Sequence, residues 1–378
     1  MRDAAVGSTT RPSIAVSILS GNEARLDDGD LDALLAVPSA EWVSSDDERL
    51  RRLAEHGLLV SDSSEPELAE LRRRDEQLGA NGWFLYAALY HSLTRRHGLD
   101  LELAEDLDEK RRAKAATAIA MRTARGGPPP AHFHSAPGAR AVHELPLEEP
   151  SGELYDVLRR RRTVRGYEPD ATMSLAQLST VMRTVFGCTG TVPIAEGFAL
   201  QKKTSPSGGA LHPTEAYPLI RRVEGIASGL YHYNVERHAL ELLEELTEDE
   251  ATEYLRRATC GQAHFQHAQV AFVLTSRFRR NFWKYWAQRD QYGVLLLDAG
   301  HLSQTLYLVA TELGLDAFVT AIVNHDDIGA RLGLDRFDEG VLAICGCGVA
   351  APESGLRPRF RPFTPQRQSQ KRGPSPSP

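Results

Sequence analysis

The apolar positions between residues 281 and 314 follow the period of an α-helix. They recur at alternating steps of three and four, which places them on one helix face: Tyr292, Leu295, Ala299, Leu302, Leu306, Val309 and Leu313. Further apolar residues at positions 294, 296, 297 and 308 widen this stripe beyond that of a surface helix. We therefore expect one central helix from Asn281 to Gly314, covered on most sides and ended by the glycine.

Two glycines, Gly293 and Gly300, stand inside this predicted helix, seven residues apart and nearly on one face. Each is expected to cost about 1 kcal/mol of helix stability relative to alanine. Such a cost is reasonable where another backbone approaches closely. That backbone could belong to the same domain or to a second subunit, and the sequence leaves both open.

Residues 1–125 form the predicted N-terminal domain. The pattern of residues 14–60 indicates a strand, two helices and a second strand, with a capping box from Ser45 to Glu48 opening the second helix. This order is similar to that of a small winged-helix unit, of the kind that peptide-modifying enzymes use to hold a leader peptide. A packing module without a ligand explains the pattern equally well. Helical patterns continue from Glu65 to about Met121.

A proline-rich linker is predicted at 126–150, followed by a second domain at 151–352. Its helices begin at Ser151 and after a capping box at residues 174–177. Predicted strands at 217–223, 229–233, 238–242, 270–275, 317–322 and 341–345 interleave with helices. The sequence thus predicts an α+β domain, a mixed sheet flanked by helices around the long central helix. The tail at 353–378 is rich in Pro, Arg, Gln and Ser and is expected to be largely disordered.

Composition argues against several classes of function. The 378 residues carry a formal net charge of −7, whereas a nucleic-acid binder usually shows a dominant basic surface. No apolar run approaches the roughly 18 residues of a membrane span. The N-terminal sequence MRDAAVGSTTRPS also lacks the apolar core of a signal peptide. We expect a cytoplasmic protein that binds neither nucleic acid nor membrane.

No metal site is predicted. The four cysteines, at positions 188, 260, 345 and 347, form no CxxC pair, so we expect all four to be buried, reduced thiols. His132 and His134 lie in the proline-rich linker without a third ligand nearby.

Three polar segments are candidates for chemistry. Arginines between positions 159 and 165 follow an apolar helix, which indicates cations that face a bound anion, although a basic run is more often a solvated face. The loop at 203–217 is rich in glycine, serine and proline, and its backbone N–H groups can face an anion or a polar ring edge. Lys284 and Tyr285 stand between two tryptophans, where a lysine stem packed along aromatic rings is the alternative to a catalytic role.

These segments resemble motifs of the FMN-dependent nitroreductase superfamily, and most closely its SagB-type branch, the azoline dehydrogenases of ribosomal peptide maturation. Residues 161–165, RRTVR, are similar to the family's RRSxR, and residues 205–217, SPSGGALHPTEAY, to PSAGALHPxExY. Residues 283–315 resemble KY…LLDAGHxxQNLxLxAxxLGL. The resemblance extends from about residue 151 to 350. Three positions depart from it: Thr163 replaces a serine, Gly208 replaces an alanine in a change expected to be harmless, and Gly293 replaces a common arginine.

The resemblance implies a homodimer with FMN at the subunit interface. Cationic donors would stabilise the negative pole of the reduced flavin, and Arg161, Arg162 and Thr163 are the implied residues for that pole and the ribityl chain. The candidates for its phosphate are Arg165, Arg357 and Arg359. The loop Pro206–Gly209 would lie against the ring system. The complete cofactor-binding set is Arg161, Arg162, Thr163, Arg165, Pro206, Ser207, Gly208, Gly209, His212, Gly346, Arg357 and Arg359.

The resemblance also implies dehydrogenation of thiazoline or oxazoline rings in a ribosomally made precursor peptide, with a cyclodehydratase as a possible further partner. Lys284 and Tyr285 are the implied catalytic pair and would handle the proton. Because free lysine and tyrosine keep their protons at neutral pH, we expect nearby arginines and partial burial to favour the neutral amine.

Two other classes of function remain open. One is reduction of a nitro group, a quinone or a peptide dehydroamino acid by NAD(P)H through the same cofactor. The other is a non-catalytic adaptor that binds a leader peptide.

Overall fold

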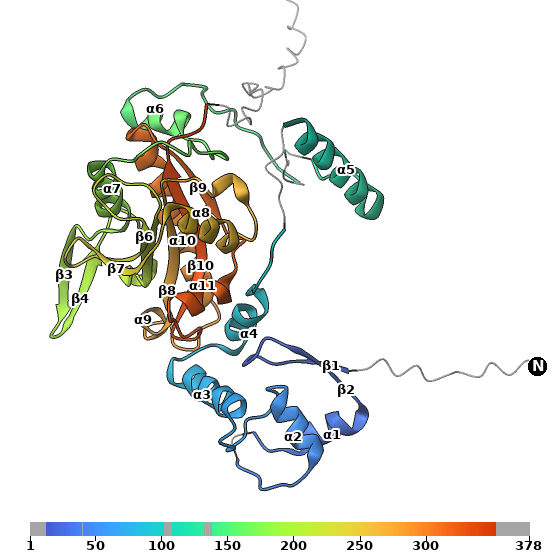
Figure 1. The fold of residues 1–378 in the computed structure, drawn as a ribbon. Coiled ribbons are helices and arrows are strands. Elements are labelled where there is room, and N and C mark those ends of the chain that lie inside the picture. The colour runs from blue at the N-terminus through green and yellow to red at the C-terminus, as the bar shows by residue number, and fades with distance from the viewer. Residues whose placement is uncertain are drawn as a thin grey trace, which may run out of the picture.

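The computed structural model describes residues 13–39, 41–101, 108–131, 133, 136 and 138–352, with 108–115 described by their backbone. The tail at 353–378, including Arg357 and Arg359, lies outside the described residues, as do the linker histidines His132 and His134. A large domain built on a sheet forms the body of the molecule, and a smaller N-terminal part lies at one end of it (Figure 1).

A six-stranded sheet forms the centre of the large domain, in the order β7-β6-β5-β8-β10-β9. The strands are β5 (Thr214–Ile220), β6 (Gly229–Asn234), β7 (Ala239–Glu245), β8 (Val270–Arg277), β9 (Asp316–Thr320) and β10 (Glu339–Gly348), so all six predicted strands are present. Their pairings are all antiparallel. Among the described residues, parallel pairing occurs as single bridges, Thr163 with Ala317 and Met173 with Val223.

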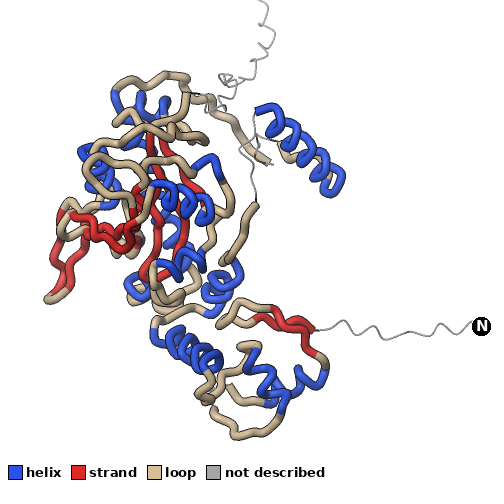
Figure 2. The backbone as a smooth tube through the Cα atoms, viewed as in Figure 1, coloured by secondary structure: helices blue, strands red, loops and turns tan. Residues whose placement is uncertain are grey.

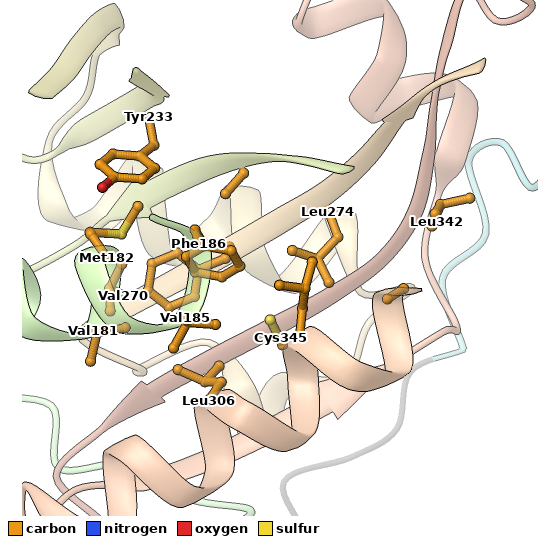
Figure 3. Packing of buried hydrophobic residues seen from close by; sticks show 14 of the residues in the cluster. Val181, Met182, Val185, Phe186, Tyr233, Val270, Leu274, Leu306, Leu342 and Cys345 are labelled. Atoms are coloured by element: carbon orange, nitrogen blue, oxygen red, sulfur yellow. The ribbon is translucent and has the colours of Figure 1, made fainter. Parts of the chain in front are cut away.

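Each face of this sheet has its own apolar core, because side chains alternate between the two faces. One face packs against α10 (Gln291–Glu312), α7 (Leu175–Val181) and the π-helical turn Met182–Phe186. Figure 3 shows Val185, Leu306 and Cys345 in this core, each from a different element. The other face packs against α8 (Glu248–Ala258) and α11 (His325–Arg331). The α+β fold with a long central helix is confirmed.

The central helix begins at Gln291 and not at Asn281, as the apolar pattern had predicted. The short helix α9 (Phe278–Phe282) and the loop Trp283–Asp290 precede it. Ala287 interrupts the helix because its φ is 49° and its N–H donates to the carbonyl of Gly82 instead of a helical partner. The predicted core face is confirmed, since Tyr292, Leu295, Ala299, Leu302 and Leu306 are buried.

The opposite side of α10 is open within the chain, so the expected cover on most sides is wrong for a single chain. Leu296 and Leu297 are exposed, Leu297 to 63%. A Cβ built on Gly293 or Gly300 meets no atom within 4 Å. No described backbone of the same chain therefore requires these two glycines.

The order of elements in the N-terminal part differs from the prediction. It begins with the antiparallel strands β1 (Ser13–Val16) and β2 (Glu23–Leu26), followed by α1 (Asp28–Ala36), α2 (Glu48–Glu55) and α3 (Pro66–Ala80). Residues 58–60 form no strand. The N-cap of α2 is Asp47, which accepts from the N–H of Arg49, whereas Ser45 accepts from the N–H of Asp47. The predicted strand–helix–helix–strand order is therefore wrong.

Helix α4 (Leu85–Thr94) packs into the large domain, although its sequence lies within the predicted N-terminal domain. Trp83, Ala87 and Ala88 are buried in the core on the α10 side of the sheet. Helix α5 (Asp108–Gly126) follows, and α6 (Glu153–Arg160) opens the predicted second domain. The described residues between 127 and 150 form neither helix nor strand. The N-terminal part is thus anchored to the large domain by α4.

The hairpin of β3 (Gly190–Ala195) and β4 (Phe198–Lys202) extends from the body of the domain (Figure 2) and, like α8 and α11, was not predicted. The four thiols are free, but Cys188 is only half-buried, unlike the other three. The helices of the described residues lack the combination of length and hydropathy that a membrane-spanning segment needs.

Candidate active site beside helix α10

The glycine-rich loop lies along one face of α10. Ser207 Oγ donates to Asp298 Oδ2 at 2.5 Å, and the N–H of Gly208 donates to Oδ1 at 3.1 Å. Further along the helix, His301 Nδ1 is 3.2 Å from the carbonyl oxygen of Pro206. Ser205 Oγ and Thr305 Oγ1 lie 2.6 Å apart. Positions 298, 301 and 305 follow helical spacing, so one face of α10 holds the loop from Ser205 to Gly208.

Asp298 organises this loop and was missed in the sequence analysis. It is only 3% exposed. Burial raises the pKa of its carboxyl group, while the hydrogen bonds from Ser207 and Gly208 act in the opposite direction. The sequence feature that could have identified Asp298 is a carboxylate in the middle of an apolar helix, because such a group is rarely buried without dedicated hydrogen-bond donors.

The two loop glycines allow close approach of the Lys284–Tyr285 segment. Gly209 has a φ of 62°, and a Cβ built on it would lie 2.7 Å from Lys284 Nζ. A Cβ on Gly208 would overlap Val294 of α10 and lie 3.6 Å from Tyr285 Oη. An alanine at position 208 would therefore displace Val294, so this departure from the family pattern has a local packing reason. The structure brings two predicted motifs together here.

Lys284 is exposed and Tyr285 is half-buried. Lys284 Nζ lies 5.9 Å from the centre of the Tyr285 ring. The partial burial expected for this lysine is absent within one chain. The pair nevertheless lies at the surface of the glycine turn, where a reacting group could reach it.

His212 lies at the end of the glycine turn, with a φ of 47°. Its N–H donates to Ser207 Oγ at 3.0 Å. Burial, followed by the charge of Lys203, lowers the pKa of its imidazole to about 4, so the ring is neutral at pH 7. His212, Lys203, Thr214 and Asp298 line a cavity of about 10 Å³, which is close to the space that one water molecule needs.

The arginine segment contacts α10 further along the helix, at Tyr307. The guanidinium of Arg161 lies 5.3 Å from the centre of the Tyr307 ring, and Thr163 Oγ1 lies 2.9 Å from Tyr307 Oη. Arg162 forms a two-point ion pair with Asp316, at 3.0 and 3.2 Å. Arg165 is exposed. Tyr307 and Asp316 were not among the predicted site residues, because neither lies in the arginine motif itself.

Gly346 lies in the middle of β10 and pairs with Phe318 of β9, next to Ala317, which bridges to Thr163. A Cβ built on it would meet the ring of Phe318 and, at 2.7 Å, the carbonyl oxygen of Val270. Phe318 belongs to the core on the sheet face opposite α10. Gly346 thus has a packing role between strands, and its place in the cofactor site stays a prediction.

A second concave region lies in the N-terminal part. A groove of about 1280 Å³ is bounded by the end of β1, by α2 and α3, and by the loops around residues 37–47 and 57–65. Apolar side chains such as Ile18, Leu34, Val43 and Leu68 form part of its wall. Among the described residues that line it, seven are acidic and one, Arg51, is basic; the acidic set is Glu41, Asp46, Asp47, Glu48, Asp62, Glu65 and Asp75.

Comparison with known proteins gives a family match for the large domain. Residues 158–349 match the nitroreductase family. The chain is 30% identical over 223 residues to the trifolitoxin-processing protein TfxB of Rhizobium leguminosarum bv. trifolii, which covers 57% of this chain and 58% of that protein. It is 32% identical over 185 residues to a nitroreductase-like protein of Methanocaldococcus jannaschii, covering 49% of this chain and 86% of that one.

Two solved structures show a weaker likeness. A nitroreductase-like protein from Anabaena variabilis has a TM-score of 0.44 at 22% identity, over 52% of this chain and 38% of the other. A chain of the E. coli microcin synthetase McbBCD complex, bound to truncated pro-MccB17, has a TM-score of 0.42 at 19% identity, over 65% of this chain and 95% of the other.

Proposed function

Because this chain belongs to the nitroreductase family, we propose that it is an FMN-dependent dehydrogenase that oxidises thiazoline or oxazoline rings to thiazole or oxazole in a ribosomally made precursor peptide. The family match and the match to a trifolitoxin-processing protein support an oxidoreductase of the peptide-maturation branch. The observation that carries the azoline assignment is the contact between Lys284 and the turn at Gly209. This contact brings a basic group to the loop that the family uses at its flavin.

The residues around α10 fit a flavin. The turn at Gly208 and Gly209 has no side chains and lies between Val294 of α10 and Lys284. A backbone surface without side chains suits contact with a flat ring. Arg161 and Thr163 provide a cation and a hydroxyl group at Tyr307, and the exposed Arg165 is the candidate for the phosphate. When bound, flavin supplies the two-electron acceptor for the hydride that leaves the azoline ring.

We assign to Lys284 and Tyr285 the transfer of the proton that leaves the azoline ring together with the hydride. Lys284 Nζ accepts it, and Tyr285 Oη orients the reacting group beside the glycine turn. A positioned base of this kind contributes roughly 10²–10⁴-fold to a reaction rate. His212 is not assigned a part in this step, because its ring is neutral at pH 7 and its backbone N–H is bound to Ser207 Oγ within the loop.

The exposed stripe on α10 supports a homodimer. Gly293, Leu296, Leu297 and Gly300 lie at helical spacing on one side, and the two glycines leave room for a second backbone. An exposed apolar stripe on a central helix is typical of an interface. A partner subunit on this stripe would also shield the neighbouring Lys284.

The N-terminal groove is assigned to the precursor peptide. Its volume exceeds that of a typical small-molecule pocket, and its apolar wall with an acidic rim suits an extended segment that carries apolar and basic residues. The relative that processes trifolitoxin supports a peptide substrate. A cyclodehydratase would supply the azoline ring before this enzyme acts.

Absorbance of the purified protein, followed by an assay with an azoline-bearing peptide, tests the proposal. We expect a yellow homodimer and a peptide that loses one hydrogen molecule per oxidised ring. A yellow protein that only consumes NAD(P)H with a nitro compound, a quinone or a dehydroamino acid would replace the dehydrogenase assignment by a reductase. A colourless protein that binds the peptide after reconstitution with FMN would be an adaptor.

A further inference from the structure

The loop Trp283–Asp290, which carries Lys284 and Tyr285, is closed at its base by Asn281. The carbonyl of Asn281 accepts from the N–H groups of Lys284 and Tyr285, at 3.1 and 3.2 Å. Its side-chain Nδ2 donates to the carbonyl of Gln291 at 3.2 Å. Most residues of the loop are exposed. Within the loop, the N–H of Gln288 donates to the carbonyl of Tyr285 at 3.1 Å, and the loop receives further support from distant residues.

That support comes from the turn between α3 and α4. The N–H of Ala287, in the middle of the loop, donates to the carbonyl of Gly82 at 3.0 Å. The ring of Trp286 lies directly on Gly82, because a Cβ built on this glycine would overlap the indole. Gly82 also has a φ of 71°, a backbone conformation that glycine adopts without strain.

Gln291, the first residue of α10, binds the same turn through its side chain. It is fully buried. Its Nε2 donates to the carbonyl of Gly82 at 3.1 Å, and its Oε1 accepts from the N–H of Phe84 at 2.5 Å. Both ends of a buried amide are thus used by one turn, which fixes the side chain in a single orientation.

The turn is itself firmly attached to the large domain. Asn81 Nδ2 donates to Asp338 Oδ1 at 2.6 Å and to the carbonyl of Phe337 at 3.2 Å. Trp83 Nε1 donates to the same carbonyl at 3.1 Å, and its ring packs among Phe278, Phe282 and other aromatic rings. The turn is therefore a rigid platform, not a flexible connection.

We propose that the turn Asn81–Phe84 is the platform that positions the Lys284–Tyr285 loop, with Gln291 as a positioning residue for the reaction. The N-terminal segment thereby takes part in the chemistry of the large domain by fixing where Lys284 and Tyr285 lie. This inference rests on the proposed proton-handling role of the pair. Displacement of a reacting group by about 1 Å can lower a rate on the order of 10²-fold, so a loosened platform should lower kcat.

Gly82→Ala is the direct test, because the added Cβ would displace Trp286 and strain the backbone. Gly79→Ala is the matched control: it lies three residues earlier, and a Cβ there meets no atom within 4 Å. Gln291→Met is the second variant, since it keeps the length of the side chain and removes both hydrogen bonds. None of these residues is proposed to contact substrate or flavin.

Two measurements are made on each full-length, flavin-loaded variant. Hydrogen exchange of residues 283–290 reports on the loop, and steady-state kinetics with an azoline peptide separates kcat from KM. For Gly82→Ala and Gln291→Met we expect faster exchange confined to the loop and a fall in kcat on the order of 10²-fold, with KM and flavin content unchanged. Gly79→Ala should behave like the wild type.

Unchanged exchange in both variants overturns the platform. Faster exchange with a normal kcat overturns its role in positioning, and loss of flavin with faster exchange throughout the domain reduces the turn to a purely structural element. If the wild-type protein does not oxidise azolines, the proposed function fails. The exchange measurement still decides whether the platform holds the loop.

Discussion

Ser207 donates a 2.5 Å hydrogen bond to Asp298, a carboxylate buried in the middle of the central helix. This bond and the one from the N–H of Gly208 attach the glycine-rich loop to α10. Replacing Asp298 by alanine would leave both donors without their acceptor, at a cost of about 1–3 kcal/mol. We expect a lower urea midpoint and weaker flavin retention in Asp298→Ala, with a smaller loss in Asp298→Asn, which keeps one acceptor. Wild-type stability and flavin content in the alanine variant would contradict the anchoring role.

Removing Arg161 and Arg162 together should release flavin while the fold stays intact. The ion pair between Arg162 and Asp316 is partly exposed, so its loss should change the free energy of unfolding by no more than about 1 kcal/mol. Flavin fluorescence titration gives the affinity, and circular dichroism reports on the fold. Arg159→Ala is the control, because Arg159 pairs with Asp156 outside the motif. Retention of flavin by the double variant would show that these arginines are only a solvated face.

Lys284→Ala and Tyr285→Phe should keep the yellow cofactor and the dimer, because neither residue is assigned to flavin binding. Turnover of an azoline peptide should fall by roughly 10²–10⁴-fold, mainly in kcat. Lys284→Arg should not restore it, since arginine keeps its proton at neutral pH. Lys202→Ala, an exposed lysine on β4, is the control. Near-normal turnover in Lys284→Ala would return this lysine to a packing role and remove the main support for azoline oxidation.

Reversing charges on the rim of the N-terminal groove should weaken binding of a precursor peptide. For Asp46→Lys combined with Asp62→Lys we expect about tenfold lower affinity at low salt and a smaller effect at high salt, because rim charges are screened. Asp32→Lys changes an exposed carboxylate of α1 outside the groove and serves as the control. Equal peptide affinities in all three proteins would make the groove a structural feature.

The buried histidines should make the protein less stable in mild acid. Burial, followed by the charges of Arg95 and Arg96, lowers the pKa of His325 to about 4, and burial holds the pKa of His91 well below its usual range. Between about pH 6.5 and 4 the unfolded chain binds more protons at these sites than the folded one, so stability falls as the pH falls. The slope is at most about 1.4 kcal/mol per pH unit for each histidine.

Urea unfolding at a series of pH values measures this slope. His325→Asn keeps an acceptor for the N–H of Arg96, which donates to His325 Nδ1, but removes the titrating ring. The pH dependence of the free energy of unfolding should be smaller in this variant by the contribution of one histidine. An identical pH dependence in the two proteins would show that His325 does not contribute to it.

Local chemistry was sufficient to predict much of the large domain. The core face of α10, the Ser174 capping box and the six strands follow from side-chain periodicity and short-range hydrogen bonds, and all are found in the structure. The arginine, glycine-loop and Lys284–Tyr285 motifs could also be recognised, because they are contiguous in the sequence. These features depend on residues that are neighbours along the chain.

Other features depend on contacts between distant residues and were decided by the tertiary structure. The sequence predicts a helix from Asn281, yet residues 283–290 form a loop, because Gly82 accepts the N–H of Ala287 and Trp286 packs on Gly82. In the same way, Asp298 gains its role from Ser207, and Gly346 is explained by Phe318 of the neighbouring strand. Periodicity in a sequence states which side of an element will be buried. It does not state which partner will compete for a backbone hydrogen bond, and that competition set the start of α10 and the position of the Lys284–Tyr285 loop.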